Sequence, residues 1–245
     1  MKRSAPPARA GLWTTPIRGR VAGVALAWVL AYVAGVVALV VGAILLVRLA
    51  DGPRPSPVVL AVVVFAGTAV AAVVAVRVHL VRRRGLSWAD VGLRRPERSP
   101  LHLAWQIPAV MTGGALASAA VLLLLGLGEV SAGSEGVAYL ATAGPVGIVL
   151  GLVIVALLVP LAEEVVFRGI VLPAVRARLP AATGIPLAGA VFAVVHFLPP
   201  ALPYLLVVGI SLCAMAQWYR SIVPGVVLHG VNNAVVFVGV LTAGG

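Results

Sequence analysis

Charged residues are scarce in this chain. They make up 10% of its 245 residues, whereas soluble domains average about 25%. Hydrophobic residues account for 62% of the sequence. A soluble protein of this length could not cover its surface with so few charges, so the composition excludes a soluble globular domain. It predicts that lipid forms much of the solvent around this protein.

Cysteine and lysine are nearly missing, with one residue of each, Cys213 and Lys2. A single cysteine excludes an internal disulfide, and we interpret Cys213, which lies in an apolar run, as a small packing residue. The net charge of +11 comes almost entirely from arginines that lie between apolar runs and are not interleaved with aromatic residues. This distribution argues against nucleic-acid binding and is typical of the loops that set membrane topology.

Long apolar runs are the main feature that the sequence does contain. They cover residues 21–47, 58–76, 101–127, 144–172, 185–198, 202–217 and 222–241. The first run exceeds the roughly 7–15 apolar residues of a cleaved signal peptide, so it predicts an uncleaved signal anchor. The fifth and sixth runs are shorter than the usual span of about 20 residues, and we expect short helices sheltered by the bundle, with a proline turn between them. The predicted fold is an all-α, polytopic transmembrane bundle of about seven helices.

Basic residues alternate between the loops. The N-terminal tail and the second loop (77–100) are rich in arginine, whereas the third loop and the C-terminal end have no basic residue. The positive-inside rule therefore predicts a cytoplasmic N-terminus and an outward-facing C-terminus. The high arginine content beside one lysine indicates a bacterial chain, and hence a multi-pass protein of the bacterial plasma membrane.

The second loop suggests a division of the chain into two parts. Residues 1–100 are predicted to form an N-terminal membrane anchor, with two transmembrane helices and a basic cytoplasmic loop. Residues 101–245 are predicted to form the functional core. Within the basic loop, the stretch LSWADVGL (86–93) predicts a short interfacial helix anchored by Trp88 and Leu93.

Only two of the seven acidic residues, Glu163 and Glu164, interrupt an apolar run. A carboxylate at the centre of a membrane helix costs about 2.5–3.5 kcal/mol, so it needs a partner or a function. Arg168 lies one helical turn beyond Glu164 and is predicted to pair with it. Glu163 points about 100° around the helix and has no cation nearby on its own helix. We therefore assign chemistry to Glu163 and support to Glu164.

Three further polar residues lie in two other apolar runs. His196 is in one run, while His229 and Asn233 share one helix face in another. At ~1.5 Å per residue from the predicted cytoplasmic ends, these groups and Glu163 lie about 12–20 Å deep, which agrees within a helix tilt. The sequence thus predicts one site inside the bilayer. The neighbouring Asn232 points elsewhere and is predicted to make a hydrogen bond between helices.

Three motifs occur in order: Glu163-Glu164-x-x-x-Arg168, Phe192-x-x-x-His196 and His229-x-x-x-Asn233. They resemble the motifs of the CPBP family, which comprises the CAAX prenyl endopeptidases and the bacterial Abi-type proteins. The resemblance covers residues 163–233, and the stretch 86–93 is similar to an element that many bacterial members carry before this domain. It implies that residues 101–245 form a CPBP-like intramembrane protease core, in which Glu164 and Arg168 support the site.

The resemblance also implies catalytic roles. Glu163 would activate water with help from His196, while His229 and Asn233 would stabilise the oxyanion of a tetrahedral intermediate. The expected activity is that of an intramembrane endopeptidase, glutamic or metal-dependent, acting in the lipid bilayer on a membrane-associated peptide or protein.

The cofactor and the function class keep alternatives open. Glu163, His196 and His229 could form a three-ligand zinc site with an open position. The HExxH motif of helical zinc proteases is missing, and we favour a metal-free reaction. A non-catalytic immunity or binding protein that retains the protease fold is the main alternative function. A proton-coupled transporter would also bury carboxylates and histidines, but the sequence shows no paired broken-helix repeats.

Overall fold

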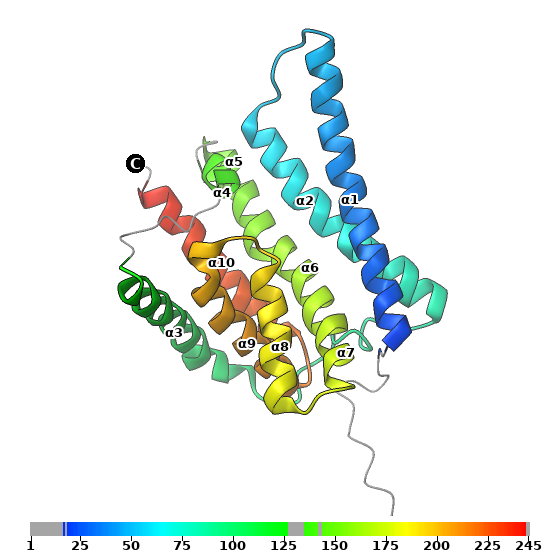
Figure 1. The fold of residues 1–245 in the computed structure, drawn as a ribbon, viewed down its shortest axis with the longest axis vertical. Helices are drawn as coiled ribbons and strands as arrows, with labels where there is room; N and C mark the ends of the chain where they lie inside the picture. Colours follow the sequence, from blue (N-terminus) through cyan, green and yellow to red (C-terminus); the bar gives the residue numbers. More distant parts are fainter. Residues whose placement is uncertain (1–16, 18, 127–134, 142–143, 244–245) are drawn as a thin grey trace, which may run out of the picture.

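The computed structural model describes residues 17, 19–126, 135–141 and 144–243. Within these ranges the chain is predominantly helical and has no strand, which confirms the all-α prediction. Six of the described helical segments are long and apolar enough to cross a membrane. The protein is therefore a multi-pass membrane bundle (Figure 1).

The helical elements follow the predicted apolar runs. In chain order they are α1 (Gly19–Leu49), α2 (Pro57–Val76), η1 (Arg77–Arg82), η2 (Pro100–His102), α3 (Leu103–Leu124), α4 (Glu135–Ala141), α5 (Gly144–Val153), η3 (Ile154–Leu158), α6 (Val159–Val166), η4 (Phe167–Val171), α7 (Leu172–Arg176), α8 (Ala181–Val194), η5 (Pro199–Ala201), α9 (Leu202–Tyr219) and α10 (Val223–Ala243). The short helix α4 lies in a predicted loop. The fifth and sixth runs were both predicted to form short helices. The sixth, formed by η5 and α9, has 21 residues and is long enough to span a membrane, so of these two runs only the fifth, α8, is short.

The end of α8 differs from the prediction. The helix stops at Val194, so His196 lies in a turn and not within a helix that continues to residue 198. Phe197 has a positive φ of 51°, which breaks the helical path. Pro199 then disfavours the helical conformation at the residue before it.

The stretch 86–93 forms turns, so the prediction of a short interfacial helix there is wrong. Val91 is fully buried, and a Cβ on Gly169 would lie 2.6 Å from its carbonyl oxygen. Trp88 and Leu93 pack against the same apolar cluster as Val91. This stretch is therefore a loop docked on the bundle, and its hydrophobic residues contact protein.

The segment from α5 to α7 carries the two glutamates and contains two π-helical turns, η3 and η4. Each turn is followed two residues later by a proline, Pro160 or Pro173, which has no N–H to donate to the preceding turn. The Val159 N–H bonds to the carbonyl of Ile154, five residues back. The carbonyl of Val155 is then left for another donor, because the next residue in the π pattern is Pro160.

Helices α8 and α9 form a close hairpin in the middle of the bundle (Figure 1). Gly189 and Gly209 allow this approach, since a Cβ on Gly189 would lie 2.6 Å from the backbone nitrogen of Ile210. Cys213 on α9 is fully buried in the apolar core, as predicted for a packing residue.

The two N-terminal helices also join the bundle: α1 packs on α2, and α2 contacts α6. The division of the chain at residue 100 stays a prediction.

Candidate active site

Glu164 and Arg168 form the predicted ion pair. The Nη1 of Arg168 donates to Oε1 of Glu164 over 2.8 Å, and both side chains are fully buried. The guanidinium also donates to the carbonyl of Gly209 and lies 4.3 Å from the centre of the Phe192 ring. The pair thus connects α6 and η4 to both arms of the α8–α9 hairpin.

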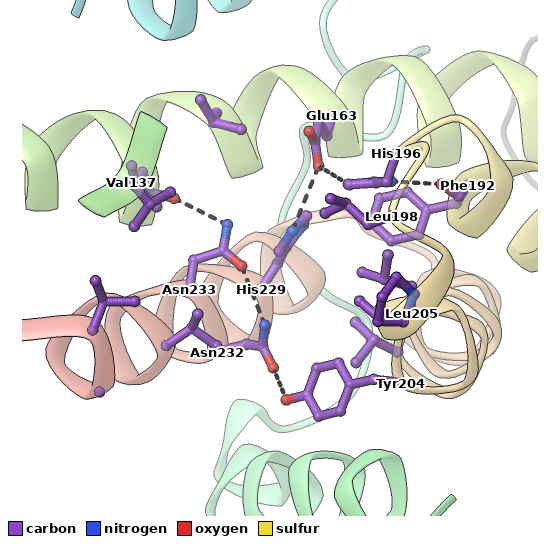
Figure 2. Close-up of a pocket in the computed structure, with 18 of the residues that line it drawn as sticks. Val137, Glu163, Phe192, His196, Leu198, Tyr204, Leu205, His229, Asn232 and Asn233 are labelled. Carbon is purple, nitrogen blue, oxygen red and sulfur yellow. Dashed lines mark hydrogen bonds and ion pairs between the residues drawn. The ribbon is translucent and has the colours of Figure 1, made fainter. Parts of the chain in front are cut away.

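Glu163 points away from this pair and into a cavity. Its Oε2 lies 3.5 Å from Nε2 of His229 and 3.8 Å from Nε2 of His196 (Figure 2). Among the described residues, no donor makes a hydrogen bond to this buried oxygen atom. The structure therefore brings three of the predicted site residues together from α6, the turn after α8, and α10.

Both imidazole rings are held by their Nδ1 atoms. Nδ1 of His196 is 2.7 Å from the carbonyl oxygen of Phe192, which can only accept, so this nitrogen carries the proton. Nδ1 of His229 is 3.1 Å from Oε1 of Glu164 and donates to that carboxylate. Each Nε2 consequently faces Glu163. Glu164 has a second contact that the sequence did not predict, because it orients a histidine 65 residues away.

Asn233 lies in the same cavity as Glu163 and both histidines. Its Nδ2 donates to the carbonyl of Val155 over 3.1 Å, the group left free by the π-helical turn before Pro160. Its Oδ1 accepts from Nδ2 of Asn232 over 3.2 Å. These two bonds fix the orientation of the amide, and among the described residues no acceptor takes the second N–H of Asn233.

Tyr204 is a site residue that sequence reasoning missed. Its hydroxyl donates to Oδ1 of Asn232, which confirms that Asn232 bonds between helices (Figure 2). Through Asn232, this bond from α9 also helps to orient Asn233. The ring packs so closely on α3 that a Cβ on Gly114 would be 2.8 Å from it. A tyrosine one turn after a proline cluster gives no signal for this role in the sequence.

We expect Tyr204→Phe to lower the rate of peptide cleavage about two- to tenfold, the effect of losing one hydrogen bond of roughly 0.5–1.5 kcal/mol. The ring and its packing on Gly114 are retained, so the variant should stay folded, with its stability lowered by about 1–3 kcal/mol because the buried Oδ1 of Asn232 loses this donor. Tyr32→Phe, on α1 and outside the cavity, is the matched control and should keep full activity. Unchanged cleavage by Tyr204→Phe would show that Asn233 needs no support from α9.

The cavity has a volume of about 710 Å³. Its lining includes the polar side chains of Glu163, His196, His229 and Asn233, while the rest of the wall is mainly valine, leucine and other apolar residues from nine helical elements. This size and character match those of sites that bind an apolar ligand and fix it with a few polar groups.

A zinc ion would require donors arranged around one point. Glu163, His196 and His229 have donor atoms of the kinds that zinc accepts. Among the described residues, however, no group of three or more such side chains is placed to hold a metal ion. The side chains as positioned do not fit a metal, and we derive no catalytic step through one.

Fold and site together define a class of protein: a multi-pass α-helical membrane protein with a carboxylate–imidazole site inside the bundle. Residues 145–235 match the family model for Type II CAAX prenyl endopeptidase Rce1-like proteins, and this confirms the predicted CPBP resemblance over that segment. The match includes all three motifs. No curated protein and no solved structure matches the chain significantly. At the level of the family, the match supports an intramembrane CAAX-type endopeptidase with a membrane-associated substrate.

Proposed function

We propose that this protein hydrolyses a peptide bond of a membrane-associated protein or peptide, with Glu163 as the general base that activates water. One observation carries the proposal: Oε2 of Glu163 faces two imidazole Nε2 atoms at 3.5 and 3.8 Å at the polar end of an apolar cavity. Such distances are long for direct hydrogen bonds and suit a bridging water molecule.

The reaction follows from the positions of these groups. Glu163 takes a proton from water, and the water oxygen attacks the carbonyl carbon of the scissile peptide. The carbonyl oxygen then becomes an oxyanion. The oxyanion re-forms the C=O bond, and the C–N bond breaks as the nitrogen receives the proton held by Glu163, with His196 beside Glu163. The products are a carboxylic acid and an amine, and the acid then passes its remaining proton to the amine, so that a carboxylate and an ammonium group leave.

The oxyanion needs donors that are already in place. Among the described residues, one N–H of the Asn233 amide has no acceptor, because its other polar contacts are made with Asn232 and Val155. His229 is the second group that we assign to the oxyanion, and Glu164 holds its ring through Nδ1.

The proposal is tested by comparing membrane peptides in cells that produce the wild-type protein or the Glu163→Gln variant. We expect one or more membrane-associated proteins or peptides to accumulate uncut only with the variant, and the wild type to cut them after purification. Identical peptide sets, with full biological activity of the variant, would instead support the alternative of a non-catalytic immunity or binding protein.

Chelation tests the metal-free form of the reaction. We expect the purified protein to retain cleavage after exhaustive treatment with a chelator and to contain no stoichiometric zinc. The physical reason is that water activation here uses the Glu163 carboxylate and two imidazoles, with no Lewis acid. Activity that is lost on chelation and restored by added zinc would contradict this form of the proposal.

A further inference from the structure

Arginines of the described chain gather at one end of the bundle, where α2, α7 and α9 end and where α3 and α10 begin. They include Arg77, Arg82, Arg83, Arg84, Arg94, Arg95, Arg98, Arg176, Arg178 and Arg220. We refer to this as the arginine-rich end. Hydrogen bonds join its loops, since Arg94 donates to the carbonyl of Arg220 and Arg176 donates to Gln217.

A second cavity, of about 760 Å³, lies at the arginine-rich end and shares no lining residue with the catalytic cavity. It is formed by the start of α3, the start of α8 and the end of α9. Trp105 and Trp218 line it, and tryptophan is enriched where membrane helices reach the lipid headgroups. The cavity therefore lies at headgroup depth, and we call it the interfacial pocket.

Gln106 places a buried amide in the wall of the interfacial pocket. The residue is only 7% exposed, and its Oε1 accepts from the hydroxyl of Tyr219 over 2.8 Å. Among the described residues, no acceptor takes the N–H groups of this amide. Buried polar groups are normally hydrogen-bonded, so these donors indicate a ligand that carries an acceptor atom.

Arg98 brings a cation to the same pocket in a fixed orientation. Its Nε donates to the carbonyl of Trp218 over 3.1 Å, and its guanidinium lies 4.9 Å from the centre of the Trp218 ring. Within the part of the chain that the structure describes, its two terminal NH₂ groups meet no acceptor. A guanidinium held in this way presents a fork of donors, which matches the oxygen atoms of a phosphate.

The charge around the interfacial pocket is positive. Glu97 also borders the pocket, but its carboxylate already pairs with Arg94 and Arg220. With Arg98 added, three arginines and one glutamate give a formal net charge of +2. The remaining wall includes apolar side chains from all three helices, such as Ile185 of α8. The ligand that fits this wall is an anion with an apolar part.

We propose that the interfacial pocket binds the phosphate of an anionic membrane lipid. Arg98 and Gln106 donate to phosphate oxygens, and the apolar wall takes the part of the lipid nearest to the headgroup. A zwitterionic phospholipid has the same phosphate but also an ammonium group, which the positive charge of the pocket disfavours. Lipid binding needs no peptide cleavage, so this site stands apart from the proposed function.

Native mass spectrometry of the full chain in detergent measures the binding of single lipid molecules. The probes are phosphatidylglycerol and phosphatidylcholine with identical acyl chains. We expect the wild type to bind the first molecule of phosphatidylglycerol about tenfold more tightly than phosphatidylcholine, because of the net charge of the pocket.

Two variants of the pocket and one matched control test its donors. Arg98→Gln removes the cation, while Gln106→Glu keeps an acceptor for Tyr219 but replaces the amide donor with a carboxylate. Each should weaken phosphatidylglycerol binding about tenfold, the effect of losing a charge-assisted hydrogen bond or of adding a like charge. Arg84→Gln makes the same change of charge at an exposed position outside the pocket and should keep wild-type affinity.

Equal affinity of the wild type for the two lipids would overturn the proposal. Equal losses in Arg98→Gln and Arg84→Gln would also overturn it, since the lipid would then respond to surface charge in general. Inorganic phosphate, compared with chloride at the same ionic strength, should leave phosphatidylglycerol bound; full displacement would mean that the pocket takes a free anion and no lipid. If Gln106→Glu does not fold, the exposed Arg98→Gln decides the outcome.

Discussion

Glu163→Gln is expected to lower peptide cleavage by roughly 10²–10⁴-fold, the contribution of a positioned general base. Glutamine keeps the size of the side chain, but its amide cannot take a proton from water. Glu163 makes no hydrogen bond to another described residue through Oε2, and its side chain is 26% exposed to the cavity. The variant should therefore fold as well as the wild type, with an unchanged thermal midpoint.

Two matched carboxylate variants separate chemistry from structure. Glu97→Gln removes a carboxylate at the arginine-rich end that pairs with Arg94 and Arg220, and it should leave cleavage unchanged. Glu164→Gln should reduce both activity and stability, because Glu164 holds Arg168 and orients His229. Cleavage by Glu163→Gln at close to the wild-type rate would refute its assignment as the base.

Hydrophobicity was enough to predict the long helices. Each of the seven apolar runs is helical over most of its described residues, since a bilayer leaves few other ways to satisfy backbone hydrogen bonds. The different directions of the adjacent glutamate side chains also followed from the sequence, because the helical rotation between them is a local property. Local rules of this kind depend on neighbours within one turn.

The side-chain contacts that sequence reasoning missed join distant segments. Glu164 meets His229 across two helices, and Tyr204 reaches Asn232 from a third. His196 leaves its helix because Phe197 takes a positive φ before two prolines, while the apolar run itself continues without a break. Hydropathy reports burial in lipid, and it carries no information on which buried polar groups meet.

The cavity also shows how a proline can help to position a polar side chain inside a membrane bundle. Pro160 removes one backbone donor, and the carbonyl of Val155 takes its hydrogen bond from Asn233. On α10, Gly230 lets the backbones approach, since a Cβ there would lie 2.3 Å from the carbonyl oxygen of Ala156. The Val155 carbonyl, which lacks a backbone donor in its own helix, is thus satisfied by Asn233 of α10. The same hydrogen bond holds the Asn233 amide in place.

Arg168→Met is expected to lower the free energy of unfolding by about 3–5 kcal/mol, because it leaves the buried carboxylate of Glu164 without its cation. Methionine roughly fills the space of the arginine stem, so a packing defect contributes little. Arg84→Met, at an exposed position of the arginine-rich end, is the matched control and should change stability by no more than about 0.5 kcal/mol. Thermal or denaturant unfolding in detergent measures both variants.

The double variant Glu164→Gln with Arg168→Met decides whether the arginine acts through the carboxylate. Removing both charges leaves no uncompensated ion in the bundle, so the double variant should be more stable than Arg168→Met alone. It should nevertheless cleave poorly, because His229 then loses the carboxylate that holds its Nδ1. The contrary result is a double variant that is no more stable than Arg168→Met. It would mean that Arg168 stabilises the bundle through its contacts with Gly209 and Phe192, and that the ion pair is not what holds Glu164 in place.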